Sequence, residues 1–465
     1  LARAAHAEAL AEAERLSAVA PYSSRTAYWL GRALEESGAS ARAQESYERA
    51  LVLDPDNAEA FQRFWFLADG AGRTRIFDWL GQQILQTPSA GGAISAWFDI
   101  AAVRLPFQEV QEKLDQIRER HRTCWPAWHC AIENLLRFHF PEKAGELARE
   151  AIAQFPLVPA VHAEAAAAFE RAGSTEEAEA ALQRAIVLNP SDPDLWARQA
   201  WLHDRTGNPD EGVRVLNEGI RRNPGEAALR AVLAGLLWKK NLQDEAFVQM
   251  HHALARNPGM DWAWDRFCEW CIAQSRHGHF AEFIRSVAAT RPGDIGLLTM
   301  QARGLLRCGM PGEADAVIDR ILILQPRNID AHLLRTEILV GRGRFEEALD
   351  LCVGERWRDN PPALLRGQAA AVEAASKRLQ RAIERIQDVV EKEPGYVWAW
   401  ERLAEWSLAK REFSLARTAA VRVTELIPQR GQAWHNLAMI ENTAGNEKEA
   451  VRCLREAVRR EPSYE

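Results

Sequence analysis

The stretch VWAWERLAEW, at residues 397–406, decides the fold because related stretches recur upstream at a fixed distance. Residues 261–270 read DWAWDRFCEW, and residues 125–134 read WPAWHCAIEN. The second tryptophans of the three stretches, Trp128, Trp264 and Trp400, are evenly spaced, at four times a 34-residue period. Self-similarity at a period of this length indicates a repeat architecture in which each unit stacks on its neighbours.

Three further residue types follow the same 34-residue frame. Proline closes most units, at Pro55, Pro156, Pro190, Pro224, Pro258, Pro292, Pro326, Pro394, Pro428 and Pro462. A small residue, which lets two helices cross closely, recurs at the twentieth position, at Ala43, Ala144, Ala178, Gly212, Ala246, Ala314, Ala348, Ala382, Ala416 and Ala450. Glycine, which ends a helix with little strain, recurs in mid-unit, at Gly38, Gly72, Gly173, Gly207, Gly309, Gly343 and Gly445. In the three units that contain the opening stretches, His139, Ser275 and Arg411 replace this glycine.

This spacing resembles that of the tetratricopeptide repeat (TPR), a helix–turn–helix unit of about 34 residues. The resemblance implies an all-α TPR solenoid, a right-handed superhelix of about thirteen repeats, with a concave surface lined by the first helix of each unit. We predict an N-terminal helix at 1–23 that packs on the first repeat, three units at 24–124, and ten in-phase units at 125–464. The predicted units are 24–57, 58–91, 92–124, 125–158, 159–192, 193–226, 227–260, 261–294, 295–328, 329–362, 363–396, 397–430 and 431–464. Units 58–91 and 92–124 are irregular, because Pro88 comes one residue early and the next unit lacks its final proline.

Composition limits the partners and the compartment. Hydrophobic content of 47% with 26% charged residues is that of a folded protein, and the net charge of −7 disfavours a nucleic-acid partner. Seven cysteines without disulfide spacing fit a reducing compartment, so we expect a cytoplasmic protein, and the arginine- and alanine-rich composition points to a bacterial source. Every apolar run is far shorter than the ~20 residues of a membrane span. The start at Leu1 and the end directly after a predicted helix suggest a fragment of a multidomain protein.

The candidate partner-binding residues share one face of the first helix in three units. Positions two, five and nine of such a helix lie on one face. These positions hold Trp262, Asp265 and Glu269, then Trp398, Glu401 and Glu405, and, in the remaining unit, His129 and Glu133 at positions five and nine. An aromatic ring beside carboxylates suits a basic or arginine-bearing peptide. For the two tryptophans of this set, packing between units stays open as an alternative, whereas Trp264 and Trp400 are expected to fill the helix-pair core.

Three other patterns are assigned to packing or are missing. Cys268-x-x-Cys271, followed by two histidines, has the outline of a metal knuckle, but both thiols fall on the side that faces the partner helix. We therefore expect core packing there, with no metal and no cofactor. His251-His252 is expected on a solvated face of a second helix. The lysine and asparagine of the carboxylate clamp in chaperone-binding TPR domains are absent from positions five and nine of every unit.

The sequence contains no catalytic motif, such as a phosphate-binding loop, a nucleophile elbow or a metalloprotease helix. We therefore predict a non-catalytic scaffold that binds a peptide or protein partner, expected to be basic, on its concave face. Two alternatives stay open. The array could be the substrate-selecting or sensing arm of a larger enzyme or signalling protein whose catalytic domain lies outside these residues. It could also be an RNA-processing scaffold, because its W-x-W-x-R pattern resembles half-a-TPR repeats.

Overall fold

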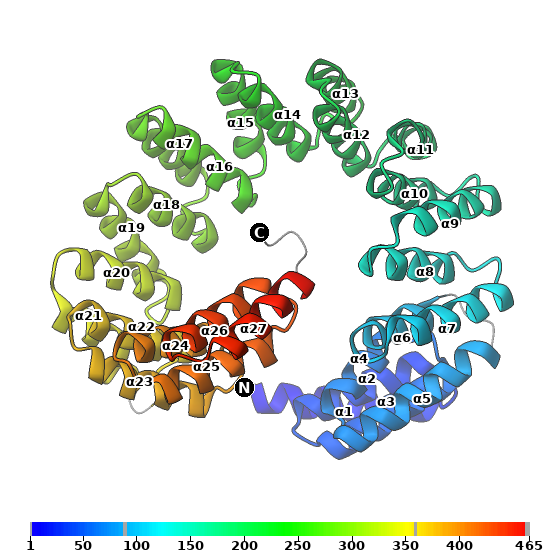
Figure 1. Cartoon of the computed structure of the whole chain (residues 1–465), viewed down its shortest axis with the longest axis horizontal. Coiled ribbons are helices and arrows are strands. Elements are labelled where there is room, and N and C mark those ends of the chain that lie inside the picture. Colours follow the sequence, from blue (N-terminus) through cyan, green and yellow to red (C-terminus); the bar gives the residue numbers. More distant parts are fainter. Residues whose placement is uncertain (1, 87–90, 358–359, 461–465) are drawn as a thin grey trace. The chain divides into compact units, whose positions relative to one another are not determined.

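The chain folds as an all-α repeat protein. The computed structural model describes residues 2–86, 91–357 and 360–460, in which there are 27 α-helices, one short 3-10 helix and no strand. Two compact units, Leu1–Gln249 and Met250–Glu465, make up the chain. Within each unit, successive helices pack against one another along the chain (Figure 1). The repeat positions of Pro88 and Pro462 lie outside the described residues.

From α2 onward the helices alternate between first and second helices of the 34-residue frame. The first unit contains α1 (Ala2–Val19), α2 (Ser24–Glu36), α3 (Ser40–Leu53), α4 (Ala58–Leu67), α5 (Gly70–Gln86), α6 (Gly92–Arg104), α7 (Phe107–Arg120), α8 (Trp125–Arg137), α9 (Pro141–Gln154), α10 (Pro159–Arg171), α11 (Thr175–Leu188), α12 (Pro193–Arg205), α13 (Pro209–Arg222) and α14 (Ala227–Lys239). Helix α15 (Gln243–Arg256) contains the division between the units. The second unit continues with α16 (Asp261–Ala273), α17 (His277–Thr290), α18 (Ile295–Arg307), α19 (Pro311–Leu324), α20 (Ile329–Gly341), α21 (Phe345–Val353), η1 (Glu355–Trp357), α22 (Ala363–Ala375), α23 (Leu379–Lys392), α24 (Val397–Ala409), α25 (Phe413–Leu426), α26 (Gly431–Thr443) and α27 (Glu447–Arg460). The number of repeats and their boundaries remain a prediction.

A left-handed residue ends the first helix of most pairs. Six of the seven predicted glycines have positive φ values of 70–87°, as this turn requires. His139, Ser275 and Arg411 adopt the same conformation without being glycine, at φ values of 55–62°. The prediction for Gly72 is wrong, because Asp69 caps the next helix by accepting a hydrogen bond from the Gly72 backbone N–H at 2.7 Å. Helix α5 therefore begins at Gly70 and contains Gly72.

The twentieth position of the frame lies where the two helices of a pair come closest. The alanines at this position are fully or almost fully buried. At Gly212 even a methyl group is too large, because a Cβ atom would lie 2.8 Å from the Ala200 carbonyl oxygen in α12. Close approach of the two helix backbones thus explains why this position carries no bulky side chain.

A recurring hydrogen bond explains the second tryptophan of the W-x-W stretch. At the fourth position of six units, a Trp or His ring nitrogen bonds the carbonyl oxygen of the proline that closes the preceding unit. The pairs are His162–Pro156 at 3.0 Å, Trp196–Pro190 at 2.9 Å, Trp264–Pro258 at 2.9 Å, His332–Pro326 at 3.0 Å, Trp400–Pro394 at 3.0 Å and Trp434–Pro428 at 2.9 Å. We call these contacts the junction hydrogen bonds. Each one satisfies a carbonyl at a turn where no helical partner is available.

Candidate functional site

In α16 the predicted binding residues form a face whose acids already have partners. Trp262 is 51% exposed, whereas Trp264 is 1% exposed, as expected for the core. Arg307 of α18 reaches back to both predicted carboxylates, at 2.9 Å from Asp265 and 3.5 Å from Glu269. The structure therefore brings the two acids together, but around a guanidinium of this chain.

In α24 the predicted residues separate into packing and cavity-lining groups. Trp398 is partly buried, stacks on Tyr396 with ring centroids 5.7 Å apart, and lies against Gly367 of α22. Glu401 and Glu405 line a cavity of about 440 Å³ together with the exposed Met439 of α26. Each acid is paired: Glu401 with Arg430 at 3.2 Å, and Glu405 with Arg402 at 2.6 Å. Trp400, expected in the core, is only partly buried.

The third predicted pair belongs to a patch of acids on α6, α8 and α10. His129 lies 3.5 Å from Glu133 and 3.8 Å from Glu164, so the predicted pair is in contact. Arg137 also pairs with Glu133, at 3.3 Å. Burial, together with the charge of Glu133, raises the pKa of Asp99 above its ordinary value. We call Asp99, Glu133 and Glu164 the acidic patch.

The two cysteines of the Cys268-x-x-Cys271 pattern pack in the core of the helix pair. Cys268 and Cys271 are buried, and the Cys268 sulfur lies 3.8 Å from that of Cys308 in α18. Burial raises the pKa of the Cys271 thiol to about 12, so it is protonated at neutral pH. Among the described residues no group of three or more His, Cys, Asp or Glu side chains could hold a metal ion. In the same part of the chain, no helix combines the length and the apolar character that a membrane crossing needs.

The assignment of His251 to a solvated face is wrong. Its ring stacks on Phe283 with centroids 4.0 Å apart, and it lies 4.9 Å from His279 and 5.2 Å from Phe267. The ring packs here because α17 supplies aromatic side chains that cover this face of α15. Burial, with smaller effects from His279 and His252, lowers the pKa of His251 to about 4.

We expect this histidine to make the second unit less stable in acid. The folded state holds the pKa of His251 near 4, below the ordinary value of 6.5, so its neutral form is favoured on folding. This contribution is complete above pH 6.5 and is lost as the pH falls toward 4. At about 1.4 kcal/mol per pKa unit, reduced by partial solvent access, the loss is of the order of 1–2 kcal/mol. His251→Phe keeps the stacking and removes the titration.

Thermal melts followed by circular dichroism at a series of pH values test this expectation. The melting temperature of the wild-type chain should fall more steeply between neutral pH and about pH 5 than that of His251→Phe. Parallel curves for the two proteins would show that the pKa of His251 is not depressed by folding.

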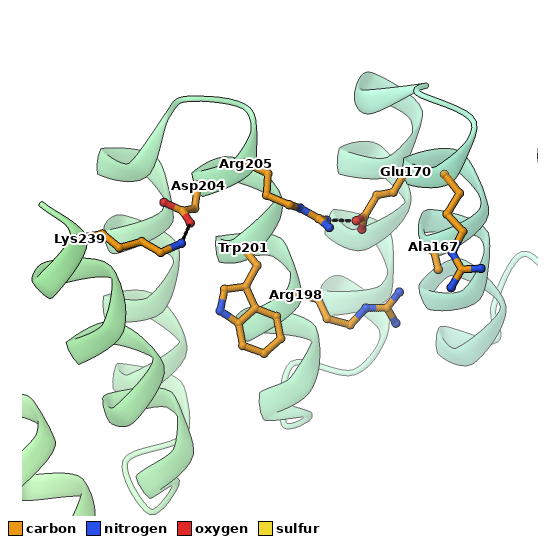
Figure 2. A pocket seen from close by; sticks show the side chains of 8 residues that line it. Ala167, Glu170, Arg198, Trp201, Asp204, Arg205 and Lys239 are labelled. Atoms are coloured by element: carbon orange, nitrogen blue, oxygen red, sulfur yellow. Dashed lines mark hydrogen bonds and ion pairs between the residues drawn. The ribbon is translucent and has the colours of Figure 1, made fainter. Parts of the chain in front are cut away.

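A second cavity, which the sequence analysis missed, lies on α10, α12 and α14. It has a volume of about 550 Å³, and Trp201, which is 48% exposed, is one of its lining residues (Figure 2). Trp201 occupies the ninth position of its predicted unit. The other lining residues are Ala167, Glu170, Arg171, Arg198, Asp204, Arg205 and Lys239. We call this the Trp201 cavity.

Charges around the Trp201 cavity follow the repeat period. Arg171, Arg205 and Lys239 occupy the thirteenth position of three successive units. Arg205 pairs with Glu170 of the preceding unit, and Lys239 pairs with Asp204 at 2.5 Å (Figure 2). The repeated base at position thirteen is the sequence signal that could have located this site.

Two arginines of the Trp201 cavity remain without a carboxylate. The Arg171 side chain makes no hydrogen bond or ion pair with any described residue, because Leu136 occupies the place that Glu170 and Asp204 have in the following repeats. Arg198 is partly buried and donates from one Nη atom to the Ala163 carbonyl oxygen at 2.7 Å. This bond fixes the guanidinium while its other donors stay available.

Comparison with known proteins identifies the repeat. Three tetratricopeptide-repeat family models match, over residues 171–236, over 132–193, and over both 24–57 and 431–464. The chain matches no curated protein sequence.

Three of the solved structures that resemble this chain are MamA, YrrB and Naa15/Naa10 bound to HypK-THB. MamA is 18% identical, with a TM-score of 0.30 over 35% of this chain and 95% of that chain. YrrB, described as a TPR protein with an unusual peptide-binding site, is 18% identical, with a TM-score of 0.29 over 40% of this chain and 95% of that chain. Naa15/Naa10 bound to HypK-THB is 11% identical, with a TM-score of 0.44 over 100% of this chain and 87% of that chain.

Proposed function

This chain is a tetratricopeptide-repeat protein, and we propose that it is a non-catalytic scaffold that binds an extended segment of a partner protein on the first helices of its repeats. Repeats of this family stack into an extended surface made of side chains from many repeats, which suits the binding of a partner. In the first compact unit the proposed binding surface is the Trp201 cavity, and in the second it comprises the cavity at Glu401 and Glu405 and the exposed ring of Trp262. The predicted residues would contribute charges to the surface of their own unit, His129 and Glu133 in the first and Asp265 and Glu269 in the second.

One observation carries this proposal: each compact unit has a cavity that first helices line, joined in the second unit by Ala420 and Val423 of the second helix α25. In each cavity the ninth position of a 34-residue repeat supplies a large, half-exposed apolar side chain. This side chain is Trp201 in the first compact unit and Met439 in the second. Charged side chains surround this anchor in both places. An apolar anchor in a concave site with a polar rim is the arrangement found where a few residues provide most of the binding energy.

Trp398 is proposed to pack between units and not to bind. Its ring lies against Gly367, where a Cβ atom would come within 2.9 Å of the indole. A side chain held in this way is not free to contact a partner. Of the two tryptophans that the sequence left open, only Trp262 has half of its surface exposed and available.

We expect peptides selected by display on the full chain to lose affinity when a cavity anchor is removed. Trp201→Ala and Met439→Ala should each weaken binding of the peptides that occupy that cavity by about tenfold or more, because a buried anchor contributes at least ~1.4 kcal/mol. Val52→Ala and Ile323→Ala are matched controls, since both side chains are apolar and exposed but lie on second helices.

Fluorescence anisotropy of labelled peptides measures these changes, and circular dichroism shows whether each variant is folded. Losses confined to the two cavity variants support the first-helix surface. Equal losses in the second-helix controls, or no loss in any variant, would place binding elsewhere on the molecule.

A further inference from the structure

The charges of the Trp201 cavity leave it with a net positive character. Four of its lining residues are basic and two are acidic, and both acids are already neutralised by ion pairs with Arg205 and Lys239. The two remaining cations, Arg171 and Arg198, have no carboxylate partner among the described residues. The cavity therefore has two unpaired guanidinium groups in a chain whose net charge is −7.

The two unpaired arginines differ in a way that suits them to one ligand. Arg198 is held by the Ala163 carbonyl, so its planar group is fixed before a ligand arrives. Arg171 is exposed and unattached, so it can move to complete the contact. A guanidinium binds a carboxylate through two parallel N–H···O bonds, and a fixed guanidinium loses less side-chain entropy on binding.

Trp201 supplies an apolar surface next to this pair. It lies three residues after Arg198 on α12, so both side chains occupy one face of the helix (Figure 2). A half-exposed indole can accept an apolar side chain of the ligand and exclude water from the adjacent charge contact.

We propose, on the basis of the scaffold function above, that the Trp201 cavity selects an acidic segment of a partner protein. An Asp or Glu carboxylate binds Arg198 and Arg171, and an apolar side chain close to it in the partner's sequence packs on Trp201. The partner at this place is thus opposite in charge to the basic peptide that the sequence predicts for α16 and α24, whose acids are themselves paired with arginines of this chain.

The surroundings of the cavity favour a single acidic segment over a nucleic-acid strand. A bound strand requires a row of cations along its phosphates. Here the acidic patch lies on the neighbouring α6 and α8 and extends to Glu164 of α10, and Arg137, the base that precedes Arg171 in the position-thirteen series, is already paired with Glu133. Phosphates that continued in this direction would be repelled, whereas a protein segment needs to be acidic only at the cavity.

An array of short synthetic peptides tests the proposal on the full chain. Each peptide carries one leucine or phenylalanine, and its other positions are glutamate in one series, glutamine in a second and lysine in a third. We expect the glutamate series to bind about tenfold more tightly than the glutamine series, and the lysine series to bind least. Anisotropy measurements with labelled members provide the affinities.

Substitutions separate the charge contact from the apolar contact. Arg171→Gln and Arg198→Gln should each reduce the preference for glutamate over glutamine several-fold, whereas Trp201→Ala should weaken both series alike. Arg171→Gln removes no side-chain hydrogen bond or ion pair with the described residues, and the side chain is exposed, so the fold should be retained. Arg221→Gln, on the second helix α13, is the matched control, and it should leave the preference unchanged.

The outcomes distinguish this inference from the scaffold proposal. If both uncharged and acidic series bind equally and Trp201→Ala weakens both, the cavity binds peptides but does not select acids, and only the inference is wrong. If no series responds to Trp201→Ala, the cavity is not a binding site, and the scaffold proposal also fails there. Tighter binding of oligouridylate than of the glutamate peptides, with a steep loss in salt, would identify nucleic acid as the ligand.

Discussion

Trp264→Ala should lower the free energy of unfolding of the second unit by about 3–5 kcal/mol, as for other large aromatic side chains removed from a core. The indole is 1% exposed, and its ring centroid lies 5.6 Å from that of Phe283 and 6.2 Å from that of Phe267. Its removal leaves a cavity. It also removes the indole N–H that donates to the carbonyl oxygen of the buried Pro258 at 2.9 Å. Urea unfolding followed by circular dichroism measures the change.

Two variants on the same helix resolve the origin of this effect. Trp264→Phe keeps an aromatic ring but loses the junction hydrogen bond, so it should be destabilised by about 1–2 kcal/mol. Trp262→Ala, two residues earlier and 51% exposed, should change stability by less than about 0.5 kcal/mol. Equal destabilisation by Trp262→Ala and Trp264→Ala would contradict the division of the W-x-W stretch into a core residue and a surface residue.

Arg385→Ala should destabilise the chain by about 3–5 kcal/mol, because it leaves a buried charge without its partner. Glu373 of α22 is 4% exposed, and Arg385 of α23 donates to both of its carboxylate oxygens, at 2.9 and 3.0 Å. The hydrogen bond to Glu373 also raises the pKa of Arg385 above its ordinary value, so this base stays charged. The midpoint of urea unfolding provides the measurement.

An exposed ion pair and a double substitution complete this test. Arg378→Ala removes a surface contact with Glu346, which should matter by less than about 1 kcal/mol. Replacing both Glu373 and Arg385 by leucine should recover most of the stability lost in Arg385→Ala, because neither charge is then left buried. If Arg385→Ala and Arg378→Ala behave alike, water must reach Glu373 and the pair is not buried in solution.

The helix–turn–helix pattern of single repeats was predictable, because the residues that mark it recur at fixed positions in the sequence of each repeat. A small residue at position twenty, a proline at position thirty-two and a left-handed turn between helices depend on contacts that recur in each repeat. The frame failed at Gly72, where a single capping residue, Asp69, moved the start of α5. The cap, and not the spacing of the repeat, sets the start of this helix, because the Asp69 carboxylate satisfies a backbone N–H of the first turn directly.

Features that depend on contacts between different repeats were not predictable. The burial of Trp398 depends on a glycine in the preceding pair, Gly367, and the burial of His251 depends on Phe283 in the following one. The candidate acids lie on α8, α16 and α24, the first helices of their predicted repeats, but their arginine partners lie up to 42 residues away in sequence, as for Asp265 and Arg307. Sequence position shows which face a residue occupies, but not which side chains from neighbouring repeats already cover it.

Four of the junction hydrogen bonds are made by tryptophans, whose fluorescence can report on unfolding. Trp196, Trp264, Trp400 and Trp434 each lie where one repeat meets the next, with the indole N–H bonded to a proline carbonyl. Opening of a junction would expose its indole to water and shift its emission to longer wavelength. Because repeat proteins are held by nearest-neighbour interfaces, comparing the emission of the wild-type chain during unfolding with that of single Trp→Phe variants at these four junctions would report whether the array unfolds in one step or from one end.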